Sequence, residues 1–242
     1  MEVPSSYIEG YNGAINAVVD SVQTELAAAL SLVDYDQPID DLRRELIRIM
    51  EDYCSAASSV GARVSADFYD ELKRRVTGHG ASMLSFQDMR DPASTRKAVL
   101  ALLRELEDGE LDSIEALEAE LLNQVEVEVK RGAAWNTIDN VRSDNEDVMY
   151  ARVPQGETTC DFCIMLASRG PVYYTEESAG AFAKFHPHCD CKVVPFFNTS
   201  VSGASRRTST MKVAGYDPDA LYKQYRATQE RKREWHRKHD HK

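Results

Sequence analysis

Apolar residues recur at helical spacing through most of the first 150 residues. In residues 38–57 they form one stripe, at intervals of three or four positions, made by Leu42, Leu46, Ile49 and Tyr53. A second set continues the same spacing: Val60, Val64, Phe68 and Leu72. The pattern predicts either one long helix or two helices with a bend near Gly61.

Local signals mark the ends of this helical stretch. Asp40 or Asp41 is the expected N-cap, with Pro38 just before it. The sequence Gly-His-Gly at 78–80 is the expected break.

Further helices are expected downstream. One begins at Asp91 with Pro92 in the first helical position. A fourth helix is predicted from about Ser113 to Arg131, and a fifth over residues 133–142.

The pattern changes near residue 147. Three short segments, 147–154, 170–175 and 191–198, have the composition of strands, with a short helical stretch predicted at 176–185. Each piece is too short to form a core alone, so a small sheet here needs a cross-link or packing on the helices.

The last 40 residues are different again. Residues 199–215 are rich in Ser, Thr and Gly and predict a linker. A final basic helix follows, with Asp217 as N-cap and Pro218 in the first turn. The whole pattern predicts an α+β, mostly α-helical protein: a helical bundle or extended helices in 1–145, a small α+β module in 146–200, and a linker with a basic helix in 201–242.

Charge divides the chain into an acidic body and a basic tail. The net charge is −11, but residues 203–242 hold 11 Lys/Arg and 5 Asp/Glu, so residues 1–202 carry −17. An acidic body argues against general nucleic-acid binding by residues 1–202. No apolar run approaches the roughly 18 residues of a membrane span. The N-terminus lacks a secretory signal pattern, so we expect a reducing compartment, where thiols and metal thiolates persist.

Four of the five cysteines fall in two short windows. Cys160 and Cys163 form a C-x-x-C pair, a spacing that lets two thiolates share one tetrahedral metal ion. The second window, "HPHCDC", supplies His186 and Cys189 as the preferred further ligands, with Cys191 as an alternative to Cys189. His188 is the remaining candidate. The sequence therefore predicts a structural zinc ion that staples the small module.

Other interpretations of these cysteines fit the sequence less well. A redox C-x-x-C requires a strand and helix in a βαβ context, and it leaves the second window unexplained. Structural disulfides require an oxidising compartment. A catalytic zinc keeps an open coordination position, whereas here there are more candidate ligands than a zinc ion needs. Cys54 is expected to be a buried thiol, and Arg169 either an anion binder or a turn residue.

The amino-acid sequence of this region resembles that of a known family. "YARVPQGETTCDFCIMLASRGPVYYTEESAG", followed by "FHPHCDCKVVPFF", is similar to the MuF-like minor capsid proteins of tailed bacteriophages, also called head morphogenesis proteins. The matching positions are Arg152, Cys160, Cys163, Arg169, Gly170, His186, Cys189 and Cys191. The upstream "EDYCSAASSVGARVSADFYDEL" resembles the helical part of the actinobacterial-phage branch, so the likeness covers about residues 40–200. The acidic Asp190 departs from the pattern.

The resemblance implies a non-enzymatic virion protein. Members are minor structural proteins that sit inside the phage head near the portal vertex, bind the portal protein, and act in capsid assembly and in DNA packaging or ejection. It implies the host cytoplasm as the place of assembly, scaffold or major capsid proteins as further partners, and no membrane association.

The basic tail offers a contact surface for DNA or the portal. Its candidates are Lys223, Arg226, Arg231, Lys232, Arg233, Arg237 and Lys238, with Tyr222, Tyr225 and Trp235 interleaved. The alternative is that these charges only solvate a terminal helix. The alternative function is a zinc-dependent nuclease or toxin-like enzyme, for which His188 and Asp190 are the nearby candidates.

Overall fold

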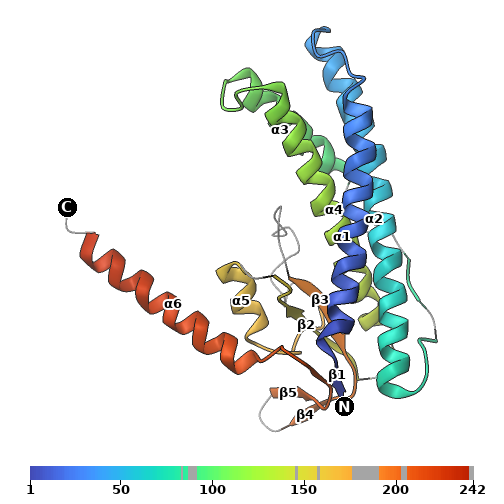
Figure 1. The fold of residues 1–242 in the computed structure, drawn as a ribbon, viewed down its shortest axis with the longest axis vertical. Helices are drawn as coiled ribbons and strands as arrows, with labels where there is room; N and C mark the ends of the chain where they lie inside the picture. Colours follow the sequence, from blue (N-terminus) through green and yellow to red (C-terminus); the bar gives the residue numbers. More distant parts are fainter. Residues whose placement is uncertain are drawn as a thin grey trace.

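The computed structural model describes residues 1–82, 84–86, 92–144, 147–156, 159–175, 191–202 and 206–239. The chain is mostly helical, with short strands in its second half (Figure 1). The helices are α1 (Ser5–Leu30), α2 (Ile39–Thr77), α3 (Pro92–Glu107), α4 (Ile114–Ser143), α5 (Asp161–Ala167) and α6 (Pro218–His239). The strands are β1 (Glu2–Val3), β2 (Met149–Val153), β3 (Lys192–Phe196), β4 (Thr199–Ser202), β5 (Arg206–Ser209) and β6 (Lys212–Val213). The predicted α+β, mostly helical class is confirmed.

Helix α2 runs unbroken through Gly61 and is flanked by α1 and α4 along its length (Figure 1). Its start differs from the prediction. The N-cap is Pro38, no side chain caps the helix, and Asp40 and Asp41 lie in the first turn. Carboxylates there stabilise the positive end of the helix dipole. Gly78, with φ of 88°, ends the helix at the predicted break.

Gly61 is a point of close approach between helices, not a bend. A Cβ on Gly61 would lie 2.3 Å from the carbonyl oxygen of Val129 in α4. On the other side of the same crossing, a Cβ on Gly132 would lie 2.2 Å from the carbonyl oxygen of Ser58 in α2. Only glycine at both positions lets the two backbones touch at this distance.

The downstream helices begin at predicted positions but end later than predicted. Helix α3 starts at Pro92, and the Ser113 side chain accepts a hydrogen bond from the Ala116 N–H at the start of α4. Helix α4 continues to Ser143, so the predicted fourth and fifth helices are one. Gly132 lies inside α4 without breaking the helix, and it is the point at which α4 packs closely on α2.

A small antiparallel sheet packs beside α4. β2 pairs with β3, with Tyr150 opposite Pro195 and Arg152 opposite Val193. The strand predicted at 170–175 contributes only one bridge, in which Tyr150 and Tyr173 exchange backbone hydrogen bonds of 2.9 and 3.2 Å. The helical stretch predicted at 176–185 lies outside the described residues.

The prediction of a linker at 199–215 is wrong. β4 and β5 form an antiparallel hairpin there, and β6 pairs in parallel with β1 at the N-terminus, with Glu2 opposite Lys212. Apolar residues on both sides of the predicted boundaries share one core, from Val3 through Phe197 to Met211. The division into three units at 145 and 200 stays a prediction.

Helix α6 leaves the body at an angle and forms a projecting arm (Figure 1). Its predicted N-cap is confirmed: an oxygen of Asp217 accepts hydrogen bonds from the N–H groups of Asp219 and Ala220, at 3.0 and 3.1 Å. No residue of α6 is buried. Among the described helices, none combines the length and the apolar character needed to cross a membrane.

Candidate functional site: a buried cysteine–arginine cluster

The first two cysteines of the predicted site lie at the start of α5. Cys160 is the N-cap, and its sulfur accepts a long hydrogen bond of 3.5 Å from the N–H of Cys163. Cys163 lies in the first turn and is buried, while Cys160 is partly exposed. A sulfur that accepts a backbone N–H at a helix start is in a position that favours negative charge.

Cys163 meets Cys191 across the fold. Their sulfur atoms are 2.9 Å apart, and both residues are buried, with exposures of 1% and 0%. Cys191 directly precedes β3, so the sheet brings it to the start of α5. The described cysteines are Cys54, Cys160, Cys163 and Cys191.

Arg152 of β2 completes the cluster. Its Nη2 lies 2.7 Å from the sulfur of Cys191 and 3.6 Å from that of Cys163. The strand register explains the meeting. Arg152 pairs with Val193, and Cys191 is two residues before Val193, so the two side chains emerge on the same face of the sheet.

The cluster contains a buried positive charge, because the Arg152 residue is only 2% exposed. A guanidinium group stays protonated in proteins and can only donate hydrogen bonds, so both sulfurs act as acceptors. Burying such a cation is costly unless a negative partner lies close. A thiolate at Cys163 or Cys191 would supply such a charge.

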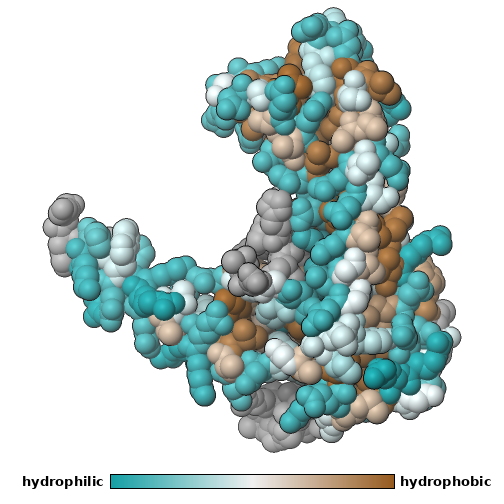
Figure 2. Space-filling model, in the orientation of Figure 1, coloured by the Kyte–Doolittle hydropathy of each residue, from teal (hydrophilic) through white to brown (hydrophobic). Residues whose placement is uncertain are grey.

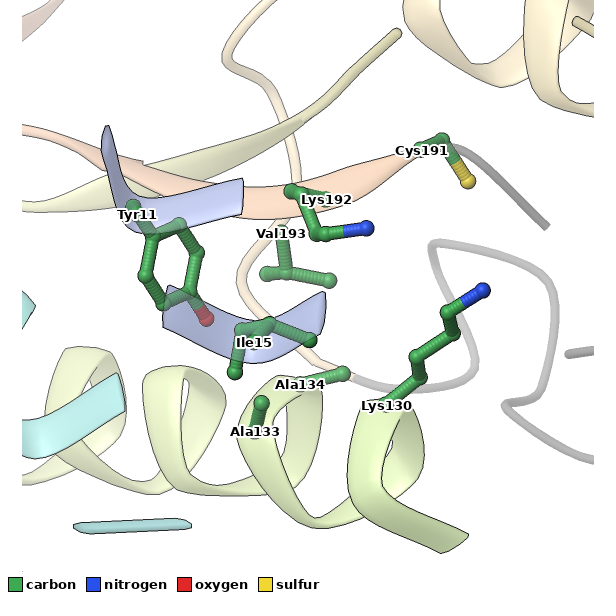
Figure 3. Close-up of a pocket in the computed structure, with 8 residues that line it drawn as sticks. All are labelled: Tyr11, Ile15, Lys130, Ala133, Ala134, Cys191, Lys192 and Val193. Carbon is green, nitrogen blue, oxygen red and sulfur yellow. The ribbon is translucent and has the colours of Figure 1, made fainter. Parts of the chain in front are cut away.

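Two lysines add to the positive surroundings. A cavity of about 10 Å³, room for about one water molecule, is lined by Lys130 of α4, Cys191 and Lys192, among others. Figure 3 shows both ammonium groups on the side to which Cys191 points. Lys130 also forms a buried ion pair with Glu126. A positive environment of this kind stabilises an anionic thiolate centre.

Tyr173 closes the cluster next to α5. Its hydroxyl donates a 2.8 Å hydrogen bond to the carbonyl of Leu166. Burial is the main reason that the pKa of Tyr173 is raised to about 12, against the opposing effect of Arg169 and Arg152. The phenol therefore stays neutral at neutral pH and keeps its role as a donor.

The structure brings together only part of the predicted zinc site. Cys163 and Cys191 are in contact, and Cys160 is adjacent to Cys163 through the backbone. His186, His188, Cys189 and Asp190 lie outside the described residues. Within the described part of the chain, no three His, Cys, Asp or Glu side chains gather closely enough to hold a metal ion.

The roles of Arg152, Lys130 and Lys192 were missed at the sequence level. The available signal was a charged residue inside an otherwise apolar strand, "VMYARV". Of the other candidates, Cys54 is a buried thiol in α2, as predicted, and Arg169 is exposed at the turn after α5. That turn includes Gly170, with φ of 75°.

The predicted contact residues of the tail are all exposed on α6. Some of them bind neighbours within the chain: Lys232 forms an ion pair with Asp161 of α5, and Arg226 lies 3.6 Å from Glu230. Tyr222 is 50% exposed and Trp235 57%.

Fold and site together define a mostly helical α+β protein built around a buried cysteine–arginine cluster. The chain belongs to the family described as VG15 protein, whose model matches residues 2–228. Membership indicates a phage-encoded protein. No curated protein and no solved structure matches the chain.

Proposed function

We propose that this protein is a minor structural protein of the phage head. It acts in capsid assembly from inside the head near the portal vertex, after synthesis in the host cytoplasm. The proposal is supported by the family match over residues 2–228, together with the resemblance of the cysteine region to MuF-like sequences. Binding to the portal protein is the proposed activity, with a role in DNA packaging or ejection.

The shape of the molecule supports a role in protein contacts. Long helices form a rigid body, and α6 projects from it with no buried residue (Figure 1). The cavity at the cysteine cluster has room for about one water molecule. A surface-contact role needs no larger cavity, so we propose no catalytic residue.

Zinc is the proposed structural ion of the cysteine cluster. The donor chemistry fits, because two buried sulfurs in contact are the soft ligands that zinc prefers. Two sulfurs on one tetrahedral zinc lie roughly 3.7 Å apart, so Cys163 and Cys191 need to separate by less than 1 Å. We propose Cys163 and Cys191, which are in contact, as two of the ligands. Cys160 would have to move closer to them to be a third, because the described residues contain no ready-made group of three ligands. His186 or Cys189 would supply the fourth. A bound zinc ion supplies folding energy to the small module.

Portal binding can be tested by co-expression with the tagged portal protein of the same phage. The protein should co-purify with the portal and not with a tagged protein unrelated to the phage head, which is the control. Mass spectrometry of purified virions and procapsids should also detect it in few copies. Absence from both particles, together with failure to co-purify, would refute the proposal.

The nuclease alternative has a direct assay. Purified protein with Mg²⁺ or Mn²⁺ should leave supercoiled plasmid intact. Nicking that is lost in the His188→Ala variant would instead assign an enzymatic function. For the metal, elemental analysis under reducing conditions should find about one zinc per chain, as a closed structural site requires. Metal-free but fully folded protein would refute the zinc site and leave the head-protein proposal standing.

A further inference from the structure

The outer part of α6, residues 230–239, lacks a folding partner of its own chain along almost its whole length. Each of these ten residues is exposed, and Figure 2 shows this segment as mostly hydrophilic surface. We name residues 230–239 the basic arm. It carries five Lys or Arg and two Glu residues, and Trp235 within it is 57% exposed.

A helix of this kind gains little stability alone. Isolated helices shorter than about 12–15 residues are marginal in water, and most helical stability in proteins comes from packing. The first half of α6 has such packing, since it contacts α5 and has partly buried residues such as Leu221 and Tyr225. The basic arm has only exposed residues and meets α5 through the ion pair of Lys232 with Asp161, so docking onto another surface would stabilise its helical form.

The opposite end of the molecule carries the complementary charge. Residues 31–45, at the α1–α2 turn, and 104–120, at the α3–α4 turn, contain 13 acidic and 3 basic residues. The two turns lie side by side, because Arg43 bonds Glu107 at 2.8 Å and the Tyr35 hydroxyl donates to Glu118 at 2.9 Å. We name these two segments the acidic end.

The acidic end also offers apolar contacts. Leu32 is 85% exposed and Ile39 39% exposed, both within this strongly charged surface. Protein interfaces combine an apolar centre with a polar rim, and an exposed tryptophan is a frequent anchor of such centres. Each of the two surfaces therefore has exposed apolar side chains for the centre of an interface: Trp235 on the basic arm, and Leu32 and Ile39 on the acidic end.

We infer that the basic arm of one copy docks on the acidic end of a second copy of this chain. Within one molecule the basic arm and the acidic end stand apart from each other (Figures 1 and 2), so we expect the two surfaces to meet between copies. The contact joins unlike surfaces, and contacts of this type generate rings when they close and chains when they do not. The inference is independent of the phage-head proposal.

DNA is a poorer occupant than a second copy. Glu230 and Glu234 lie among the basic residues of the arm and would face phosphates of like charge. Residues 1–202 carry a net −17, which opposes the approach of a polyanion to the molecule. On the acidic end, by contrast, the exposed Arg44 and Arg104, although paired with Asp41 and Asp108, present positive charge to these two glutamates.

Sedimentation velocity of the full chain tests the inference. The protein should sediment as a species larger than one 27.2 kDa chain in low salt. It should return to single chains in high salt, because the screening length falls from about 10 Å at 0.1 M to about 3 Å at 1 M. Trp235→Ala should weaken the association by about tenfold, as loss of a hot-spot residue does.

Charge reversal separates docking between copies from other occupants. An arm variant carries glutamate at Arg233, Arg237 and Lys238. An end variant carries lysine at Asp36, Glu110 and Asp112. Each variant alone should be monomeric, and an equimolar mixture should associate again, since each supplies the surface that complements the other.

A matched control changes the net charge by the same amount elsewhere, with glutamate at the exposed positions Arg63, Arg96 and Lys97. It should associate like the unmodified protein. A single-chain mass of the unmodified protein in low salt, or a mixture that stays monomeric, would overturn the inference. Monomeric protein that binds duplex DNA, and loses that binding in the arm variant, would assign the arm to DNA instead.

Discussion

Arg152 lies on a strand whose other side chains are apolar, and its guanidinium group meets two sulfur atoms instead of solvent. The same contact links β2 with the segment before β3 and with α5. Replacing the cation leaves both the sulfurs and the strand without this link. The residue therefore connects the small sheet to the first predicted cysteine pair.

Replacement of Arg152 by glutamine should destabilise the protein. A buried hydrogen bond to a charged group contributes about 1.5–3 kcal/mol, and we expect the free energy of unfolding to fall by about 2–3 kcal/mol. Chemical denaturation under reducing conditions measures it. Arg63→Gln, at an exposed position of α2, should change stability by no more than about 0.5 kcal/mol. Equal stability of the two variants would contradict this role for Arg152.

The contact between Cys163 and Cys191 also predicts which cysteine of "HPHCDC" matters most for metal binding. Cys191→Ser should lose most of its bound zinc, measured by elemental analysis and by the absorption of a cobalt-substituted sample. Cys54→Ser is the control, because Cys54 is buried in α2 outside the cluster. A variant set in which Cys189→Ser loses the metal and Cys191→Ser keeps it would reverse the assignment.

Among the helices, the crossing of α2 and α4 depends on two glycines. Gly61→Ala and Gly132→Ala should each lower the free energy of unfolding by about 1–3 kcal/mol, the usual cost of overpacking. The double variant should cost less than the sum, because helices already pushed apart by one methyl group accommodate the second. Thermal or denaturant unfolding measures both effects.

Gly13 in α1 provides the matched control for these substitutions. A Cβ there would meet no atom within 4 Å. Gly13→Ala should therefore raise stability slightly, by about 0.5–1 kcal/mol, as alanine does inside a helix. A stabilising effect of alanine at Gly61 or Gly132 would contradict the close crossing.

Elements whose signals are local could be predicted from the sequence. Helix starts at Pro92, Ser113 and Asp217 depend on residues within one turn of the boundary, so the pattern located them. Apolar periodicity located α2, and strand-like composition located β2.

Elements that depend on distant partners could not be predicted from the sequence. The β4–β5 hairpin has the Ser, Thr and Arg composition of a loop, and β1 is only two residues long. The sequence could not show whether Gly61 marks a bend or a close contact between helices, because its contact residue, Val129, is far along the chain. The contact of Arg152 with Cys191 follows from strand register, which no local pattern contains. The candidate site was therefore found as a set of cysteines but not as a cluster with a cation.

In the whole molecule, the pairing of β1 with β6 joins the two ends of the body. The N–H of Lys212 bonds the carbonyl of Met1, and that of Ala214 bonds the carbonyl of Val3, both at 2.9 Å. Val3 is fully buried as a result. The last strand of the body is therefore part of its structural core, while α6 lies beyond it.

Two truncations test this difference. A chain ending at residue 217 removes only α6 and should keep a cooperative unfolding transition close to that of the full protein. A chain ending at residue 210 also removes β6 and should lose several kcal/mol, since it deletes the buried Met211 and Val213 and exposes Val3. Circular dichroism during thermal unfolding compares the two. Equal melting temperatures would contradict a structural role for β6.

The β1–β6 pairing also fixes an order of events during synthesis. Residues 2–3 are made well before their partners at 212–213, which follow about 10–40 s later at ordinary elongation rates. The long helices have time to form and pack while β1 stays unpaired. The β1–β6 pairing can form only after residue 213 has been translated, so a polypeptide interrupted before that point keeps β1 without its partner strand.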